Sequence, residues 1–385
     1  MSKSWRVLVL GAGIGGTAAA TTLRRLLPAS SEVVLVEKAA EHVFSPSLLW
    51  LAVGRRSRRQ ITRPMSRMSR AGIRLVAGTI EKIDPQGRTV SVDGRQIEGD
   101  ALVVALGADF DLNAIPGLHA GGHNLYSLEG AESLQSALSN LGQGTFALVT
   151  AAPAYKCPAA PYEAAMLVET YLRQRKVRNQ VQMEFWAAEP GPMWVAGPAV
   201  TAGVKTLIEE RGIAYRPGRQ IREVDPAVRR LVFADGSQGS YDALAYVPPH
   251  TAPSVVREAG LTDASGWIPV NRLTLETVHA GIYAVGDVTT IPLSLGKPLP
   301  KAGTFAEEQG RVAAANIAHK LTAKGRPASF DGHGECLVET GDATAAYGGG
   351  NFYAEPFPQV ALKRPSRFWH IAKVVVERRW LRRWS

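Results

Sequence analysis

The sequence is poor in cysteine, with only Cys157 and Cys336 among its 385 residues. Two cysteines cannot staple a chain of this size into a disulfide scaffold. By themselves they also cannot supply a four-cysteine zinc or iron–sulfur site, so we expect no metal centre. A Cys-x-x-Cys redox pair is absent, because the two residues lie in different halves of the chain. A lone buried cysteine usually acts as a small hydrophobe, so only the surroundings of these two can indicate chemistry.

Long hydrophobic runs are also missing. No apolar stretch reaches the roughly 18 residues that a membrane-spanning helix needs. Residues 1–10 lead directly into a predicted strand, without the long apolar segment and cleavage site of a secretory signal. We therefore expect a cytoplasmic chain or one bound to the cytoplasmic face of a membrane. The composition, 45% hydrophobic and 20% charged, is typical of a globular chain and excludes a disordered or collagen-like one.

Acidic residues are scarce in two basic stretches of this chain, whose formal net charge is +10. From residue 363 onward only Glu377 opposes a group of basic residues: Lys363, Arg364, Arg367, Lys373, Arg378, Arg379, Arg382 and Arg383. A second group contains no acid: Arg55, Arg56, Arg58, Arg59, Arg63, Arg67, Arg70 and Arg74. Such clusters favour an anionic surface, although a solvated face explains the second group equally well. No nucleic-acid recognition motif accompanies them, so we expect no nucleic-acid partner.

The chain opens with the pattern of a dinucleotide-binding unit. A predicted strand is followed by the motif Gly11-Ala-Gly13-Ile-Gly-Gly16, an Ala/Leu-rich helix and a second strand that ends in Glu37. The glycines permit a tight turn, close approach to a pyrophosphate and close helix packing, and the helix N-terminus offers free N–H groups to phosphates. Glu37 is placed to accept hydrogen bonds from both ribose hydroxyls of an adenosine. The segment therefore predicts dinucleotide binding.

Three later segments extend this pattern. One predicted strand ends in Ala105-Leu-Gly107, another ends in Gly286-Asp287, and a helix opens at Lys301. In this order the segments resemble the FAD-binding domain of the pyridine nucleotide–disulfide reductase superfamily. The resemblance implies that Asp287 holds the ribitol of FAD and that Lys301, with the helix dipole, stabilises reduced flavin. Ala105, Gly107 and Gly286 would contact the same cofactor. The resemblance also assigns three further FAD contacts: Lys38, Pro46 and Ile80.

The second glycine motif that such flavoproteins use for NAD(P)H is missing. The strand expected over 145–150 runs into AAPAYKCPAAPYE, and no glycine occurs between Thr145 and Gly191. Without a phosphate cradle, a nicotinamide dinucleotide has poor means of docking there. This argues against an NADH dehydrogenase, a ferredoxin reductase and a glutathione-reductase-like enzyme.

These observations predict an α/β fold with two Rossmann-like dinucleotide-binding domains in tandem plus a C-terminal membrane-interface segment. Residues 1–112 and 267–325 would form the FAD-binding domain. Residues 113–266 would form the second domain, with a degenerate nucleotide site and Cys157. Residues 326–385 would carry Cys336 and a basic amphipathic helix.

The surroundings of the cysteines narrow the resemblance. Lys156-Cys157-Pro-Ala-Ala-Pro-Tyr-Glu163 and Gly334-Glu-Cys336-Leu-Val-Glu-Thr-Gly341 resemble the two cysteine segments of sulfide:quinone oxidoreductases and flavocytochrome c sulfide dehydrogenases. The resemblance covers nearly the whole chain. It implies that the two cysteines meet above one flavin face, where hydrosulfide attacks one sulfur to leave a persulfide and the other cysteine, as a thiolate, passes electrons to FAD. Which cysteine does which stays open.

Glu163 matches a carboxylate proposed as a base in these enzymes, although a simple helix-start acid explains it equally well. Two departures from the family matter. The third, upstream cysteine of many sulfide:quinone oxidoreductases is absent, which places this chain with two-cysteine subtypes. No cysteine lies near Pro46, where the sulfide dehydrogenases can anchor their cofactor covalently, so FAD should be non-covalent.

The C-terminal residues 365–384 are predicted to form a helix. Its arginines lie on one side, and Val374, Trp380, Leu381 and Trp384 lie on the other. Tryptophan beside arginine is typical of a helix in a membrane interface, although a tail packed on the FAD domain with a basic outer face is the alternative. We expect a peripheral protein of the cytoplasmic membrane that oxidises sulfide or a related sulfur donor and passes electrons through FAD to quinone.

Other hypotheses remain open at this stage. Electrons could pass to a cytochrome c, or the chain could be a type II NADH:quinone dehydrogenase despite the missing motif. A non-catalytic FAD-holding scaffold or thiol sensor is a further alternative. The oligomeric state is not determined by the sequence, and a homo-oligomer is one option.

Overall fold

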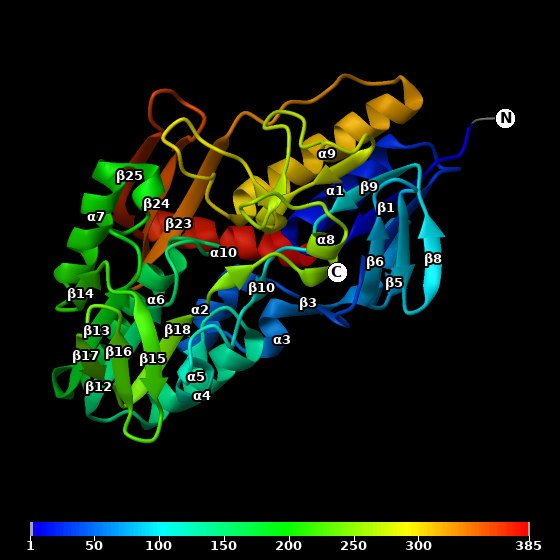
Figure 1. Ribbon diagram of the computed structural model, residues 1–385. Coiled ribbons are helices and arrows are strands. Elements are labelled where there is room, and N and C mark those ends of the chain that lie inside the picture. The colour runs from blue at the N-terminus through cyan, green and yellow to red at the C-terminus, as the bar shows by residue number, and fades with distance from the viewer. Residues whose placement is uncertain (1–2, 384–385) are drawn as a thin grey trace.

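The computed structural model describes residues 3–383, and Trp384 of the expected C-terminal helix lies outside this range. Two five-stranded parallel sheets, each flanked by helices, lie at opposite ends of the molecule, and a C-terminal sheet and helix run between them (Figure 1). The expected α/β fold is thereby confirmed.

The first sheet is built from strands of both the N-terminal and the central parts of the chain. It has the order β21-β9-β1-β2-β5, and all its neighbours pair in parallel. Its strands are β1 (Arg6–Leu10), β2 (Glu32–Glu37), β5 (Arg74–Ala77), β9 (Ala101–Val104) and β21 (Ile282–Ala284). β9 is buried along its whole length, as expected for a parallel strand that is covered on both faces and reads as a continuous apolar run.

Smaller elements complete this half of the molecule. An antiparallel sheet comprises β6 (Ile80–Asp84), β7 (Thr89–Val92) and β8 (Arg95–Glu98). A short antiparallel pair joins β3 (Glu41–Val43) and β4 (Thr62–Pro64), with the helices α2 (Leu48–Ala52) and α3 (Arg58–Ile61) between them.

Two helices of the first half cross at very short distance. α1 (Ile14–Leu26) follows the glycine motif, and α9 (Gly303–Thr322) lies against it. A Cβ atom at Gly310 would lie 2.3 Å from the carbonyl oxygen of Gly15, and one at Gly15 would lie 3.0 Å from that of Ala306. Glycine at these positions is therefore required by close backbone approach.

The second sheet has the order β11-β18-β12-β13-β14, again with all neighbours parallel. Its strands are β11 (His123–Asn124), β12 (Gly144–Thr150), β13 (Val181–Ala187), β14 (Ala214–Pro217) and β18 (Ala243–Val247). The helices of this half are α4 (Leu118–Gly121), α5 (Leu128–Asn140), α6 (Ala160–Gln174) and α7 (Pro198–Glu209). An antiparallel sheet of β15 (Ile221–Asp225), β16 (Arg230–Phe233) and β17 (Gln238–Ser240) is appended to it.

Two short strand pairs lie where the chain passes between the two halves of the molecule. β10 (Asp109–Phe110) pairs antiparallel with β19 (His250–Thr251), where the chain leaves the first half and where it returns. α8 (Ser254–Glu258) follows, and β20 (Ile268–Pro269) pairs with β22 (Thr289–Thr290).

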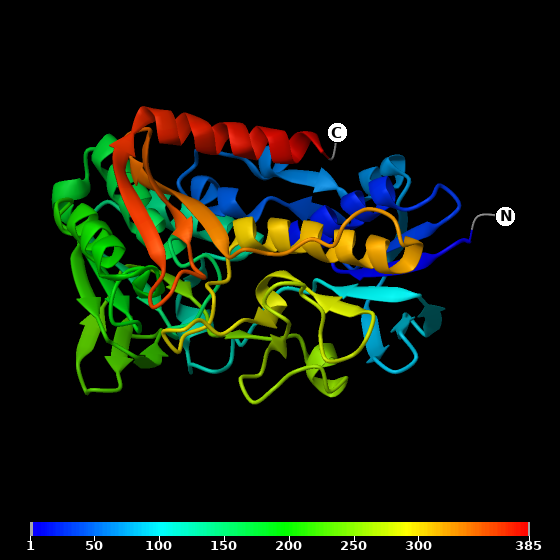
Figure 2. The same cartoon turned by 90° about the horizontal axis from the view of Figure 1, so that it is seen from above.

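The C-terminal part consists of an antiparallel sheet and a long helix. The sheet contains β23 (His333–Gly341), β24 (Thr344–Asn351) and β25 (Gln359–Ser366), and α10 (Arg367–Arg382) follows directly. Figure 2 shows α10 running along one edge of the molecule, past the first half. Within residues 3–383, no helix combines the length and the apolar character needed to cross a bilayer.

The expected orientation of the C-terminal helix is wrong in one respect. Trp380 and Leu381, which we expected on a lipid-facing side, are each only 4% exposed. The Trp380 indole N–H donates to Nε2 of His42 at 2.8 Å, and Nδ1–H of His42 points to the Ala12 carbonyl at 3.2 Å. The indole N–H therefore has a buried hydrogen-bond acceptor in the first half of the molecule. Because buried polar groups need such partners, this bond favours a buried Trp380 over one in a membrane interface. The exposed large apolar residues of α10 are others: Phe368, Ile371, Val375 and Val376.

Replacement of Gly310 tests the α1–α9 crossing. We expect Gly310→Ala to lower the free energy of unfolding by about 2 kcal/mol, because the added methyl group meets backbone rather than a side chain, and this outweighs alanine's better helix propensity. Urea unfolding followed by circular dichroism measures the change. Gly142→Ala is the matched control, since a Cβ there has nothing within 4 Å, and equal stability of the two variants would contradict the close crossing.

The docking of α10 through His42 predicts a pH dependence of stability. Burial lowers the pKa of His42 to about 4, and its hydrogen bond to Ala12 only partly opposes this. Below its unfolded-state pKa of about 6.5, His42 binds a proton in the unfolded chain but stays neutral in the native protein. The contribution of His42 to stability is therefore fully present above that pH and is lost on acidification towards pH 4.

Between about pH 7 and about pH 5 we expect the wild type to lose about 2 kcal/mol more of its unfolding free energy than His42→Gln does. Urea titrations at both pH values provide the comparison. Parallel losses in the two proteins would show that His42 does not report the docking of α10.

Candidate functional site

The glycine motif leaves an open space at the carboxyl end of β1. Gly11 has φ +95°, a conformation that favours glycine, and a Cβ at Gly16 would lie 1.9 Å from the carbonyl oxygen of Gly11. A Cβ at Gly13 would instead meet nothing within 4 Å. No side chain caps α1 and its first turn contains no acid, so its N–H groups and positive dipole end are available to an anionic ligand. A pyrophosphate fits this arrangement.

Glu37 ends β2 beside the glycine motif. Its Oε2 accepts the Ala12 N–H at 2.7 Å and its Oε1 accepts the Ala39 N–H at 2.9 Å, so two backbone bonds hold the carboxylate at the mouth of the cradle. Lys38 follows it on the surface, and Ile80 opens β6. Ala105 and Gly107 follow the adjacent strand β9, and Gly107 has φ +70° with open space around it. Together the carboxyl ends of β1, β2 and β9 fit an adenine dinucleotide.

Gly286 and Asp287 follow β21, the outermost strand of the same sheet. The Gly286 N–H donates to Oε1 of Gln309 in α9 at 2.8 Å. The Lys301 ammonium donates to the carbonyl oxygens of Asp287 and Thr289 at 2.7 and 2.9 Å. Lys301 therefore holds the turn that presents Asp287, in addition to lying just before α9.

Burial lowers the pKa of Lys301 to about 8, with the charge of Asp287 opposing the shift. Its ammonium also lies 3.4 Å from the ring centroid of Trp267. No side chain caps α9 and no acid lies in its first turn, so the N-terminal dipole is available to a flavin ring that gains negative charge.

Cys157 lies directly beside this helix start. Its backbone N–H donates to the Lys301 carbonyl at 2.6 Å, and its own carbonyl accepts the Tyr126 hydroxyl at 3.2 Å. The residue has φ +49°, a left-handed conformation that is uncommon for cysteine and clusters at functional sites. Lys156 points elsewhere, with its ammonium 4.7 Å from the ring centroid of Phe110.

Cys336 lies in β23, opposite Gly348 of β24, and both cysteines are free thiols. Burial raises the pKa of Cys157 to about 12; the charge of Glu163 adds to this and that of Lys373 opposes it. Burial also raises the pKa of Cys336, and the charges of Cys157 and Glu163 raise it further while Lys373 again opposes. The two thiols therefore share one electrostatic environment with one acid and one base.

The centre of this environment is a buried ion pair. Glu163 lies in the first turn of α6 and is 2% exposed. Its Oε2 binds the ammonium of Lys373 from α10 and accepts the Glu339 N–H of β23 at 2.9 Å. The Lys373 ammonium also donates to the Leu337 carbonyl at 2.9 Å.

The two pKa values of this pair are both raised. Burial raises that of Glu163 more than Lys373 lowers it. For Lys373, burial is the largest single effect and lowers the pKa, but the charges of Glu163, Glu339 and Cys336 and the hydrogen bond to Glu163 together raise it. Both shifts favour the protonated form of the group concerned.

A second acid and a histidine extend the pair. Oε1 of Glu339 lies 2.8 Å from Nδ1 of His370, one turn before Lys373 on α10, while Oε2 of Glu339 is buried without a hydrogen-bond partner among the described residues. The ring of His370 packs edge-on against Trp50. Three residues of this cluster, Lys373, Glu339 and His370, are not marked as site residues by any motif in the sequence. The only available signal was their spacing, since His370 and Lys373 share a helix face with the lone acid Glu377.

The acid that follows the second strand of the second sheet is hydrogen-bonded within the protein. Glu189 follows β13 and is 1% exposed. Its carboxylate accepts hydrogen bonds from the hydroxyl groups of Tyr155 and Tyr162, both at 2.5 Å, and from Thr150 at 2.6 Å. In a nucleotide-binding domain an acid after the second strand would serve a ribose, but here three hydroxyl groups of the protein occupy it.

This chain is similar in sequence and in structure to several known proteins. The sequence model described as pyridine nucleotide-disulphide oxidoreductase matches residues 5–320. The sulfide-quinone reductase of Aquifex aeolicus is 28% identical over 335 residues, which are 82% of this chain and 76% of that protein. The mitochondrial sulfide:quinone oxidoreductase of Mus musculus is 26% identical over 353 residues, 88% of this chain and 76% of that protein. The solved structure of the sulfide:quinone oxidoreductase from Aquifex aeolicus superposes with a TM-score of 0.89 at 24% identity, covering 99% of this chain and 91% of that one.

The buried ion pair makes a prediction for stability. Lys373→Met leaves the Glu163 carboxylate in the interior without its partner, so we expect the free energy of unfolding to fall by about 3–5 kcal/mol. In Glu163→Gln/Lys373→Met the unpaired charge is gone and the amide oxygen can still accept the Glu339 N–H, so most of the loss should return. Urea unfolding of the wild type, both single variants and the double variant gives the coupling energy. A coupling below about 1 kcal/mol, typical of exposed pairs, would contradict the burial described here.

Proposed function

This chain belongs to the pyridine nucleotide-disulphide oxidoreductase family and is an FAD-dependent oxidoreductase, and on that premise we propose that it oxidises sulfide and passes the electrons to membrane quinone. The observation that carries the proposal is the placement of two half-buried cysteines beside the buried pair of Glu163 and Lys373. Cys157 is hydrogen-bonded to Lys301 just before α9, and Lys373 donates to the carbonyl of Leu337, the residue after Cys336. The relatives named for sulfide and quinone, whose similarity extends over most of the chain, support it.

We propose that the two thiols work as an oxidised pair. Hydrosulfide attacks one sulfur of a Cys157–Cys336 disulfide, the S–S bond breaks, and one cysteine becomes a persulfide while the other leaves as a thiolate. FAD held by the glycine motif, Glu37 and Asp287 would supply an acceptor for one electron pair and one proton. Closure of the thiolate onto the persulfide forms a trisulfide bridge and releases that electron pair together with the persulfide proton. A second hydrosulfide then removes the middle sulfur as hydrogen disulfide ion and restores the disulfide.

Glu163 and Lys373 are the groups that can manage charge in this cycle. A thiolate is the reactive form of cysteine, and burial disfavours it at both thiols. The ammonium of Lys373 lowers both thiol pKa values, so it stabilises a thiolate when one forms. Glu163, whose own pKa is raised by burial, would take up the proton that hydrogen sulfide releases when it forms the attacking hydrosulfide.

NADH is not expected to serve as the donor. The acid that would face its ribose, Glu189, is buried under Tyr155, Tyr162 and Thr150. The turn after β12 carries Cys157 in place of a glycine cradle. Entry of a nicotinamide dinucleotide would break three hydrogen bonds to a buried carboxylate, which is a large cost.

The acceptor and the site of action complete the proposal. We propose that the protein is peripheral to the cytoplasmic membrane, holds FAD non-covalently, and draws quinone from the bilayer. The basic and apolar outer surface of α10 supports contact with a membrane. A cytochrome c acceptor is the alternative that the reoxidation experiment below distinguishes.

The two-cysteine mechanism predicts a specific kinetic outcome. In anaerobic stopped-flow experiments sulfide should bleach the flavin absorbance of the wild type within the dead time or shortly after. In Cys336→Ala and in Cys157→Ala the rate should fall below about one thousandth of the wild-type value, because the residues act as a unit. Glu163→Gln should slow it by about a hundredfold or more.

The same experiment contains its controls. Mixing with NADH in place of sulfide should leave the flavin oxidised in every variant, and unfolding temperatures confirm that the variants are folded. Reoxidation of the sulfide-reduced protein by a short-chain quinone analogue, but not by cytochrome c, is the expected result. Fast bleaching by NADH that is indifferent to Cys336→Ala would overturn the proposal.

A further inference from the structure

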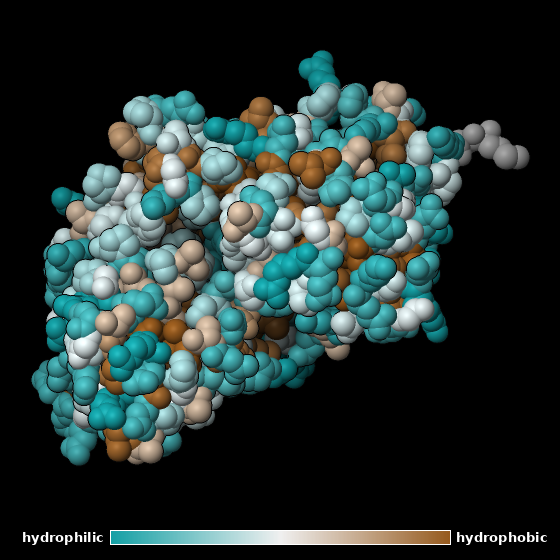
Figure 3. Space-filling model, in the orientation of Figure 1, coloured by the Kyte–Doolittle hydropathy of each residue, from teal (hydrophilic) through white to brown (hydrophobic). Residues whose placement is uncertain are grey.

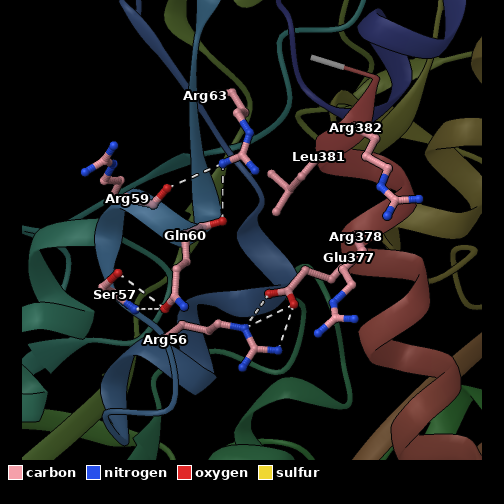
Figure 4. Close-up of a pocket in the computed structure, with 9 residues that line it drawn as sticks. All are labelled: Arg56, Ser57, Arg59, Gln60, Arg63, Glu377, Arg378, Leu381 and Arg382. Carbon is pink, nitrogen blue, oxygen red and sulfur yellow. Dashed lines mark hydrogen bonds and ion pairs between the residues drawn. The ribbon is translucent and has the colours of Figure 1, made fainter. Parts of the chain in front are cut away.

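A cavity of about 650 Å³ lies between the last turns of α10 and the segment that contains α3. Five arginines and one carboxylate line it, together with Ser57, Gln60 and Leu381. The charged residues are Arg56, Arg59, Arg63, Arg378, Arg382 and Glu377. Figure 4 shows Arg378, Leu381 and Arg382 on α10, facing Arg56, Gln60 and Arg63 across the opening. The two basic stretches of the sequence therefore meet at one place.

Most of this positive charge is not neutralised within the protein. Glu377 is occupied by Arg56, with three nitrogen–oxygen distances of 2.8 to 3.1 Å, and by the Ser47 hydroxyl at 2.6 Å. Across residues 3–383, the guanidinium groups of Arg59, Arg378 and Arg382 form no ion pair or hydrogen bond. Several arginines held around one opening match the oxygen atoms of a phosphate.

The helix that supplies the basic wall of the cavity is apolar on the same side, towards its start. Phe368, Ile371 and Val375 are 67%, 59% and 38% exposed. Together with Arg378 and Arg382 they form a series in which each residue follows the previous one by three or four positions. This spacing places all five on one helical stripe. About 10 Å along the helix axis separates Ile371 from Arg378.

The stripe on α10 differs from another face of the molecule. Figure 3 shows that the face turned towards the viewer in Figure 1 is mainly hydrophilic, with apolar side chains in small separate groups. Figure 2 places α10 along the edge of the molecule, where its outer side is not covered by another element.

From these observations we propose that the cavity binds the headgroup phosphate of an anionic phospholipid whose acyl chains lie against Phe368, Ile371 and Val375. Charge complementarity selects the phosphate, and the apolar half of the stripe selects a lipid over a soluble phosphate or a nucleic acid, neither of which covers apolar side chains. A helix in an interface buries its apolar side to a depth of about 5–10 Å. The proposal rests on the proposed membrane association and adds a defined headgroup site to it, and lipid binding can be measured without sulfide or quinone.

Vesicle flotation of the FAD-loaded protein tests the proposal. The probes are vesicles of phosphatidylcholine alone and of equal parts phosphatidylcholine and phosphatidylglycerol. We expect binding to the mixed vesicles only, and a loss of affinity of about thirtyfold in Arg59→Gln/Arg382→Gln, because each basic residue near an anionic surface contributes about a factor of five. Phe368→Ser/Ile371→Ser should also weaken binding to these vesicles, through its loss of apolar contact.

Matched controls separate this site from general surface charge. Arg70→Gln/Arg326→Gln removes the same charge from exposed positions outside the cavity and should change affinity by less than about threefold, and Val278→Ser removes an 87% exposed apolar residue outside α10. Equal effects of the two arginine pairs would overturn the proposal. So would binding of inorganic phosphate or a DNA duplex that depends on Arg59 and Arg382 while mixed vesicles do not bind. A normal response of the flavin to sulfide in the arginine variants would show that a failure here leaves the proposed function intact.

Discussion

The buried ion pair between Glu163 and Lys373 joins three segments that are far apart in the sequence, and the positions of both cysteines depend on it. Glu163 lies in the first turn of α6, a helix that begins three residues after Cys157. Cys336 lies in β23. Glu163 accepts the Glu339 N–H of β23, and Lys373 donates to the Leu337 carbonyl of the same strand. Two charges removed from water cost several kcal/mol each unless partner and hydrogen bonds compensate them. The pair therefore holds α6, β23 and α10 in one arrangement, and any sliding of one segment against another leaves a charge unpaired.

The same interaction sets the chemistry that the thiols can do. A buried thiol is normally inert because its thiolate is poorly solvated, and burial is the largest cause of both raised pKa values here. Lys373 is the charge that opposes this at both cysteines. At the other side, the backbone bond from Cys157 to the Lys301 carbonyl ties the thiol to the start of α9, where Lys301 also holds the turn that carries Asp287. The cofactor end and the sulfur end of the site are thus connected through one short segment.

The sequence was most informative where structure is decided locally. The strand, glycine motif and helix around Gly11, Gly13 and Gly16 follow from periodicity and turn chemistry within a few dozen residues. The absence of a glycine motif after β12 is equally evident from the sequence. Lys373 could not be found in this way. In sequence it is one member of a basic tail, and its partner Glu163 lies in the second half of the fold, so nothing local distinguishes it from exposed neighbours such as Arg379. The same applies to Trp380, whose acceptor His42 belongs to the first half. The helix was predicted, but its buried side depends on partners that only tertiary structure supplies.

The two sides of α10 have different surroundings, and this explains why the orientation predicted for Trp380 and Leu381 is wrong. The inner side presents His370, Lys373, Glu377 and Trp380, and each of these has a specific partner elsewhere in the chain. The outer side presents Phe368, Ile371, Val375, Arg378 and Arg382, for which the described protein provides no cover. A simple amphipathic helix has its apolar side buried and its polar side exposed; here polar groups are buried because they are paired, and apolar groups are exposed. Buried charges are stable only if they stay neutralised, so the ion pair of Glu163 with Lys373 is what permits α10 to turn a charged side towards the interior.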